Sequence, residues 1–138
     1  MVKIANIRKL IEDKEAILYS YLDDKDKDLI QMYFSVLAEQ DKNKILRLLE
    51  KFASKGEIKN KEKFKFLQGS NRIFEFKSYQ HRLLCFYLPD RTKKSLILTH
   101  GFQKQRGKTP SEQISKAERI QNILLVKNKN NELIIMEE

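Results

Sequence analysis

Basic side chains gather in the second half of the sequence, and their types suit phosphate chemistry. Three of them, Lys77, Arg82 and Lys104, lie on or beside segments that read as strands. Lysine and arginine bind phosphate and stabilise the charge that develops when a phosphodiester reacts. RNA can be cleaved without a metal, because its 2′-hydroxyl can attack the adjacent phosphate while the protein moves two protons. We therefore expect these three residues to form a catalytic site for phosphate chemistry.

A catalytic lysine needs a lowered pKa, since an ordinary lysine is protonated at pH 7 and is a poor base. Burial and neighbouring cations lower the pKa because they disfavour the charged form. Packing Lys77, Arg82 and Lys104 together would supply both effects. Arginine keeps its proton, so we expect Arg82 to clamp the phosphate. The pattern alone does not assign the general base and the general acid.

Further polar residues near this trio are candidates for substrate binding. They are Lys63, Lys65, His100, Arg106 and Lys108. A loop before a helix is a good place to dock a phosphate, but it is also an ordinary place for solvated charges. Two simpler interpretations stay open: a hydrogen-bonded structural histidine at position 100, and an exposed basic strand edge that resists aggregation over residues 59–65.

The charge of the chain is distributed unevenly. The net charge is +9, and residues 1–57 balance while all the excess falls in residues 58–138. A one-sided basic surface attracts polyanions through counterion release and electrostatic steering. A partner with a phosphate backbone is therefore favoured over a merely lysine-rich, solvated surface.

Several classes of protein are disfavoured by what the sequence lacks. It has no P-loop, no dinucleotide-binding glycine motif and no HExxH, and only two histidines and one cysteine, Cys85. We therefore expect no metal, no cofactor and no disulfide, and a buried structural thiol at Cys85. No apolar run is long enough to span a membrane and the N-terminus is unlike a signal peptide. We expect a cytoplasmic protein without a membrane partner.

The first half of the chain has helical spacing in three places. Apolar residues recur at steps of three, four and seven over about residues 3–18, where the end can turn extended, and a second stripe covers about 26–39 after an acidic start. The third stripe runs from Ile45 to Phe52, opposite a face of lysines and arginine, and Gly56 follows as a stop. The chain length of 138 residues fits a single domain over 1–138, with residues 1–15 as a helical extension.

Residues 63–104 switch to the extended pattern of strands. Three segments, 63–77, 81–88 and 95–104, are rich in aromatic and β-branched residues and are separated by short polar turns. In the first of them, alternation places Phe74 and Phe76 toward the core and Glu75 and Lys77 on the opposite face. We expect antiparallel strands with one sheet face free for chemistry.

A further helix follows the strands. Thr109 is the expected N-cap, Pro110 takes the first helical position, and Glu112 completes a capping box. The tail, residues 127–138, is expected to be partly frayed, with a short edge strand or a partner-binding segment at ELIIM.

Three motifs resemble the RelE/HigB toxin superfamily, in particular its phage-derived branch. They are FKFLQGSNRIFEFK, HRLLCFY and, the most specific of the three, LTHGFQKQRGKTPSEQISKAERI, which is similar to the family's Leu-His-x-Phe-x-Lys-x-x-x-Lys-Thr-Pro helix entry. The upstream order of a short strand and two helices is also similar, so the resemblance covers about Ala16 to Asn122. By position, Arg82, Lys104 and Lys108 match basic residues of the family pattern.

The resemblance implies an α+β fold in which an antiparallel sheet of three to five strands packs against N-terminal helices, with a C-terminal helix. It implies a toxin of a type II toxin–antitoxin pair that cleaves mRNA on the ribosome without a metal, as an endoribonuclease. Its partners would be a cognate antitoxin, typically a helix-turn-helix protein, the ribosome and mRNA. Glu75 matches a motif glutamate for which we expect a structural role, as the ion-pair partner of a neighbouring cation. Two departures stand out: Lys77 replaces an arginine and His81 replaces a tyrosine.

Two other functions fit part of the same pattern. One is the ParE-like branch of the fold, which inhibits DNA gyrase and lacks the basic catalytic set. The other is a non-catalytic module that binds nucleic acid or regulates a complex. Substituting Arg82 by alanine should abolish an enzyme, whereas it should weaken simple binding modestly and reduce its salt dependence by about one unit of slope.

Overall fold

The computed structural model describes residues 5–137, which form three helices and one sheet of seven strands. No helix in this part of the chain is both long enough and apolar enough to cross a membrane. Along the chain the elements are β1 (Ile7–Glu12), β2 (Ala16–Tyr21), α1 (Leu29–Ser35), α2 (Glu39–Lys55), β3 (Phe64–Phe66), β4 (Phe74–Ser78), β5 (His81–Tyr87), β6 (Lys94–Gln103), α3 (Ser111–Lys129) and β7 (Ile135–Met136).

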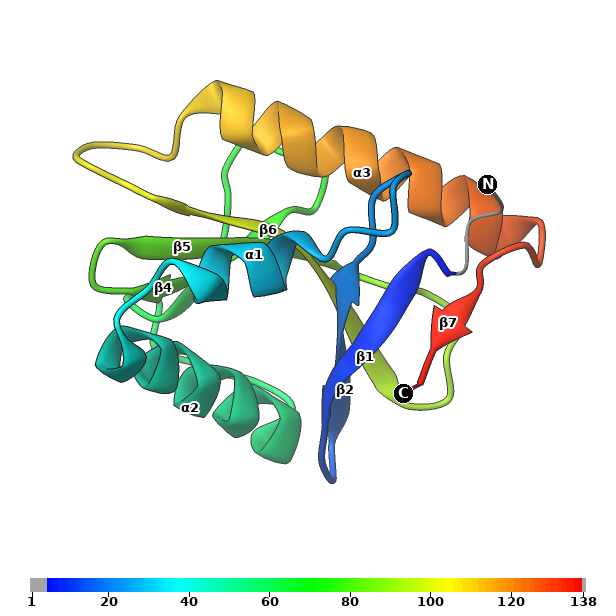
Figure 1. Ribbon diagram of the computed structural model, residues 1–138, viewed down its shortest axis with the longest axis horizontal. Coiled ribbons are helices and arrows are strands. Elements are labelled where there is room, and N and C mark those ends of the chain that lie inside the picture. Colours follow the sequence, from blue (N-terminus) through cyan, green and yellow to red (C-terminus); the bar gives the residue numbers. More distant parts are fainter. Residues whose placement is uncertain (1–4, 138) are drawn as a thin grey trace.

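The sheet has the strand order β3-β4-β5-β6-β2-β1-β7 (Figure 1). Neighbouring strands are antiparallel except for the pairs β2–β6 and β1–β7, which are parallel. The expected α+β class is confirmed, as are the antiparallel strands of the centre. The sheet is larger than the three to five strands expected, because both ends of the chain add strands to it.

The helix expected over residues 3–18 is wrong, and residues 3 and 4 of that range lie outside the described residues. The segment forms the hairpin β1–β2 instead, and β2 is wedged between β1 and β6. An irregularity between Lys9 and Ile11 shifts the register of β1. Because of that shift, Ile7 and Ile11 face opposite sides of the sheet and pack into different cores. Both positions are therefore apolar, and their spacing of four residues resembles that of a helix.

The two helices after the hairpin follow the sequence closely. Asp28 caps α1, and its carboxylate accepts hydrogen bonds from the N–H groups of Ile30 and Gln31. The helix ends at Ser35, earlier than the expected 39, and α2 then begins at Glu39. Gly56 ends α2 in the left-handed conformation, with φ of 79°, as its position in the sequence predicts.

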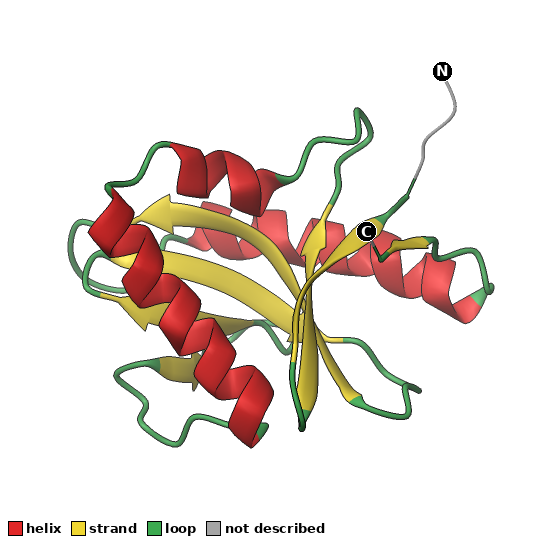
Figure 2. Ribbon diagram, turned by 60° about the horizontal axis from the view of Figure 1, so that its bottom comes forward, coloured by secondary structure: helices red, strands yellow, loops and turns green. Residues whose placement is uncertain are grey.

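Helices cover both faces of the sheet (Figure 2). One core contains residues of α1 and α2, and a second contains Ala117, Ile120 and Leu124 of α3 against the other face. The expectation of a sheet face left free for chemistry is therefore wrong, because α3 packs on that face against β5 and β6. Residues of β3 and β4 line an open groove together with the loop that leads into α3.

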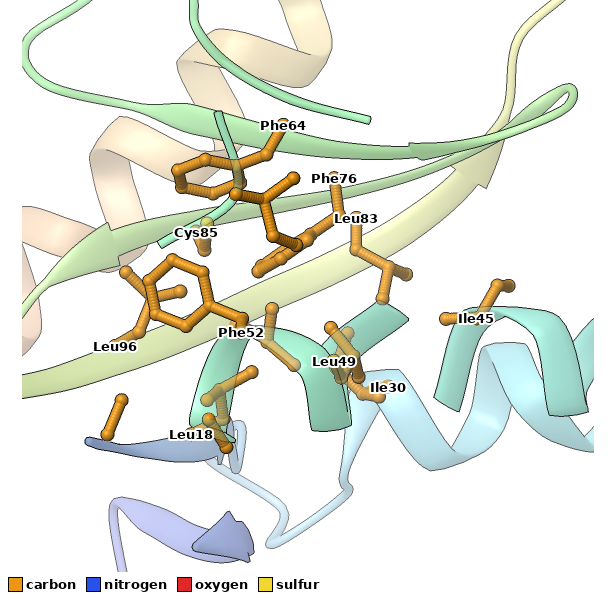
Figure 3. Packing of buried hydrophobic residues seen from close by; sticks show 14 of the residues in the cluster. Leu18, Ile30, Ile45, Leu49, Phe52, Phe64, Phe76, Leu83, Cys85 and Leu96 are labelled. Carbon is orange, nitrogen blue, oxygen red and sulfur yellow. The ribbon is translucent and has the colours of Figure 1, made fainter. Parts of the chain in front are cut away.

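Aromatic packing fixes α2 against the β3 edge of the sheet. The ring centroid of Phe52 lies 5.2 Å from that of Phe64 and 5.6 Å from that of Phe76 (Figure 3). Phe52 and Phe76 are almost completely buried. Burying such rings contributes roughly 2 kcal/mol each, so the relative position of α2 and β4 is well determined.

The end of the described chain returns to the sheet. The short edge strand expected in the tail is confirmed, since β7 pairs with β1 and Ile135 lies beside Ile7. The side chain of Asn6 accepts a hydrogen bond of 2.7 Å from the N–H of Ile134. The remainder of the tail differs from the expectation in that α3 continues to Lys129, and Glu138 lies outside the described residues.

Candidate functional site

Lys104 occupies the first position after β6, beside the turn that joins β4 to β5. Its backbone N–H donates a hydrogen bond of 2.7 Å to the carbonyl oxygen of Gln80 in that turn. The side chain is half-buried. The loop that follows, residues 104–110, then leads into α3.

The pKa of Lys104 is lowered from its ordinary value of 10.5. Burial is the largest cause, and the charges of Arg82, Lys65 and Lys77 lower it further, while Glu75 raises it. Each of these causes acts on the protonated amine, which burial and neighbouring cations disfavour. The environment of Lys104 therefore makes its amine easier to deprotonate than that of an ordinary lysine.

Strand pairing explains why residues distant in sequence act on Lys104. Lys77 of β4 is the direct cross-strand neighbour of Arg82 of β5. Lys65 of β3 is in the same way the neighbour of Glu75 of β4. Arg82, Lys65 and Lys77 are therefore near enough to Lys104 to affect its pKa, but Lys77 lines the cavity beside α2 and not the cavity that Lys104 and Lys65 line.

Arg82 lies beneath the surface, with 8% of its area exposed. Its Nη1 donates hydrogen bonds to the carbonyl oxygens of Tyr79, at 2.6 Å, and of His81, at 3.0 Å. Its Nε lies 3.8 Å from Oε2 of Glu75, and within residues 5–137 neither of these two atoms has a hydrogen-bond partner. This burial argues against the expected clamp on a phosphate. Arg82 instead supplies a positive charge under the site.

Glu75 is completely buried and links the strands to the loop after β6. Its Oε1 accepts a hydrogen bond of 2.5 Å from the hydroxyl of Thr109. Thr109 was expected to cap α3, but Pro110 holds that position without a side-chain hydrogen bond. The hydroxyl is used instead to tie the loop to β4. The expected structural role of Glu75 as an ion-pair partner fits its place beside Arg82.

Lys104 lines a groove of about 740 Å³ that we call the lysine-rimmed groove. Apolar side chains form part of its wall, including Phe66, Phe74 and Ile114. Phe66 is 38% exposed, which is a large exposure for a phenylalanine. Five lysines line the same groove, namely Lys59, Lys61, Lys65, Lys104 and Lys108. Exposed aromatic rings among cations suit single-stranded nucleic acid, whose bases stack while its phosphates pair with lysine.

The remaining candidates for substrate binding are placed differently. Lys65 and Lys108 line the groove, whereas Lys63 lines a separate cavity beside α2. Arg106 is exposed in the loop without lining the groove. His100 is buried, and its ring nitrogens lie 2.9 Å from the hydroxyl of Thr99 and 2.8 Å from Oε1 of Gln113.

Burial lowers the pKa of His100 to about 4, so its ring is neutral at pH 7. Neither a buried position nor a neutral ring suits the expected contact with a charged substrate. The simpler interpretation of His100, a hydrogen-bonded structural histidine, fits this position. Cys85 is also buried, as expected, and burial raises its pKa well above the ordinary value.

Two features of the site were not predicted from the sequence. The apolar wall of the groove brings Ile58 and Ile114 together from distant segments, and no local pattern indicates that contact. The sequence indicated that α2 carries cations opposite its apolar stripe. It did not indicate that these cations lie beside the strands. Among residues 5–137, no cluster of three or more His, Cys, Asp or Glu side chains has the arrangement needed to hold a metal ion.

The fold and the groove together define an α+β protein with a lysine-lined site at one edge of its sheet. Residues 32–122 match the model of the family described as phage derived protein Gp49-like, a domain of unknown function numbered 891. The match covers about two thirds of the sequence, from α1 to the middle of α3, and includes every candidate site residue. The chain belongs to this Gp49-like family. No curated protein matches it.

Proposed function

We propose that this chain is a toxin of a type II toxin–antitoxin pair, of the HigB-like kind, and that it cleaves mRNA in the lysine-rimmed groove without a metal. The observation that carries the proposal is Lys104, a lysine of lowered pKa among other cations at the edge of a groove with aromatic walls. Membership of a phage-derived family supports it. The resemblance of the three motifs to the RelE/HigB superfamily supplies the reaction.

In the proposed reaction the neutral amine of Lys104 takes the proton of a ribose 2′-hydroxyl. The 2′-oxygen forms a bond to the adjacent phosphorus, and the bond from phosphorus to the 5′-oxygen breaks. The leaving 5′-oxygen takes a proton from a neighbouring protonated lysine, for which Lys65 is placed on the same groove. The products are a 2′,3′-cyclic phosphate and a free 5′-hydroxyl, and every proton and electron pair is accounted for.

The remaining cations have supporting roles in this proposal. Lys108 also lines the groove and binds a phosphate next to the reacting one. Arg82 and Lys77 act through the pKa of Lys104, which both of them lower. General-base catalysis typically contributes 100- to 10,000-fold in rate, which is the scale of loss expected when Lys104 is removed.

The proposed partners follow from the proposed toxin function. They are the ribosome, which presents mRNA to the groove, and a cognate antitoxin, expected to be a small helix-turn-helix protein, that covers the groove. The chain would act as a single domain in the cytoplasm.

The test is a cell-free translation reaction on a defined mRNA, in which new 5′ ends are mapped. The proposal expects cuts at codon positions that require ribosomes and that disappear with Lys104→Met. Lys129→Met is the matched control, because Lys129 carries the same charge at the far end of α3 and does not line the groove. Intact mRNA in the presence of folded wild-type protein would contradict the proposal and favour gyrase inhibition or a binding module.

A further inference from the structure

A second basic cavity lies between α2 and the β3–β4 hairpin. It is open to solvent and has a volume of about 310 Å³, and we call it the α2 basic cavity. Three of its cations come from successive turns of α2 and two from the strand segments, namely Lys44, Arg47, Lys51, Lys63 and Lys77. Three distant parts of the sequence thus direct positive charge to one place.

These charges are poorly compensated within residues 5–137. The only ion pair in the cavity joins Lys77 to Glu62, at 3.9 Å, and the Glu62 side chain is 85% exposed. Lys44 lies over the ring of Tyr79, 4.6 Å from its centroid. The side chains of Arg47 and Lys51, like that of Lys63, have no ion pair or hydrogen bond in the described chain. Like charges held together repel one another, so a bound anion would lower the energy of this arrangement.

The cavity is preorganised by the core beneath it. The packing of Phe52 against Phe64 and Phe76 holds α2 at a fixed distance from the strands. The cations of α2 therefore do not depend on a loop for their position. Preorganised cations lose less conformational entropy on binding a ligand than cations on a mobile segment do.

Strand β3 separates this cavity from the lysine-rimmed groove. Lys61 and Lys65 line the groove, whereas Lys63, which lies between them in sequence, lines the cavity. Residues 61–63 form a turn before the strand, so their side chains do not follow strand alternation, and the lysines of this stretch line both sites. Strand β3 is also the edge of the sheet, so a ligand can pass from one site to the other around it.

We infer that the α2 basic cavity binds a backbone phosphate of the same RNA strand that occupies the lysine-rimmed groove, and so acts as a second docking point away from the reacting phosphate. The inference rests on the proposed function for the identity of the RNA. A polyanion is favoured over a single small anion because the lysines of residues 61–65 form a continuous path between the two sites. An acidic protein segment and free phosphate are the competing ligands.

The test measures binding of a 12-nucleotide oligouridylate with 2′-methoxy groups, which cannot be cleaved, by fluorescence anisotropy over a range of NaCl concentrations. Single-stranded binding loses about 0.7 of salt slope for each phosphate contact removed. We expect Arg47→Gln and Lys51→Gln each to reduce the slope by about 0.7 and to weaken binding about fivefold at 0.1 M NaCl. Lys42→Gln and Lys55→Gln are the matched controls, because they remove the same charge from α2 outside the cavity.

Equal effects of the cavity and control variants would overturn the inference, since they would show only non-specific attraction. Inorganic phosphate and a hexaglutamate peptide are measured in parallel. If the cavity variants weaken only the binding of phosphate, or only that of the peptide, the cavity serves that ligand and the RNA docking point is wrong. Because the oligonucleotide is not cleaved, failure of the proposed enzyme activity would leave this measurement interpretable.

Discussion

The buried pair formed by Glu75 and Arg82 gives a prediction whose size can be worked out. Their closest charged atoms are 3.8 Å apart, and neither atom has a hydrogen-bond partner within residues 5–137. At an effective dielectric constant of about 20, two unit charges at this distance attract by about 4 kcal/mol. Much of that attraction is offset by the cost of removing both charges from water. A coupling of about 1 to 3 kcal/mol is therefore expected.

The perturbations are Glu75→Gln, Arg82→Met and the double variant, each unfolded in urea at pH 7. Glu75→Gln keeps the shape and an acceptor for Thr109 but leaves the arginine without its counter-charge. Removing one partner of a buried pair costs about 3 to 5 kcal/mol of the free energy of unfolding. The double variant should lose less than the two single losses combined, by about 1 to 3 kcal/mol. Losses that add to within about 0.5 kcal/mol would show that Glu75 and Arg82 do not interact in this way.

Three further predictions follow from the site and the core. The rate of RNA cleavage should rise with pH and level off below the ordinary lysine pKa of 10.5. Arg82→Met should move this pH profile to higher pH, because Arg82 lowers the pKa of Lys104. An unmoved profile would argue against Lys104 as the base. The pKa of His100 is about 4 in the folded protein and 6.5 in the unfolded chain, so the unfolded chain binds the proton first as the pH falls. The free energy of unfolding should therefore decrease by about 2 kcal/mol from pH 7 to pH 5. Urea unfolding of His100→Gln should not show this decrease. Gly101→Ala should lower the free energy of unfolding by about 1 to 3 kcal/mol, measured by heat or urea, because a Cβ there would lie 2.6 Å from the ring of Tyr33. An unchanged stability would mean that the ring moves freely.

The parts of the fold that the sequence predicted well are those with local signals. The stripe of α2 ends at Gly56, and a glycine in the left-handed conformation ends the helix there. Two residues, 79 and 80, join β4 to β5, in the short turn that was expected there. Such features depend on neighbours within a few residues, so periodicity and turn residues indicate them.

The N-terminal hairpin was missed because its signal is not local. Strand β2 exists through its pairing with β6, which is about eighty residues away, and through the register shift in β1. The same spacing of isoleucines fits an amphipathic helix equally well. Partners distant in sequence decided between the two, and a pattern within residues 3–18 does not contain them.

The sequence predicted several residues of the candidate site but not how deeply they are buried. Alternation along β4 placed Lys77 and Glu75 on one face, and the hairpin register then brought Arg82 beside Lys77. Burial could not be predicted in the same way, since it depends on α3 covering that face. Arg82 was expected to clamp a phosphate and His100 was a candidate for substrate binding, whereas both are buried.

The role of Lys104 is tested by the rate of mRNA cleavage by Lys104→Met in a translating extract, compared with Lys129→Met and the wild type at matched folded concentration. We expect a loss of at least about 100-fold for Lys104→Met and a rate near that of the wild type for Lys129→Met. A Lys104→Met protein that cleaves the same positions within about threefold of the wild-type rate would show that Lys104 does not take the proton in this groove.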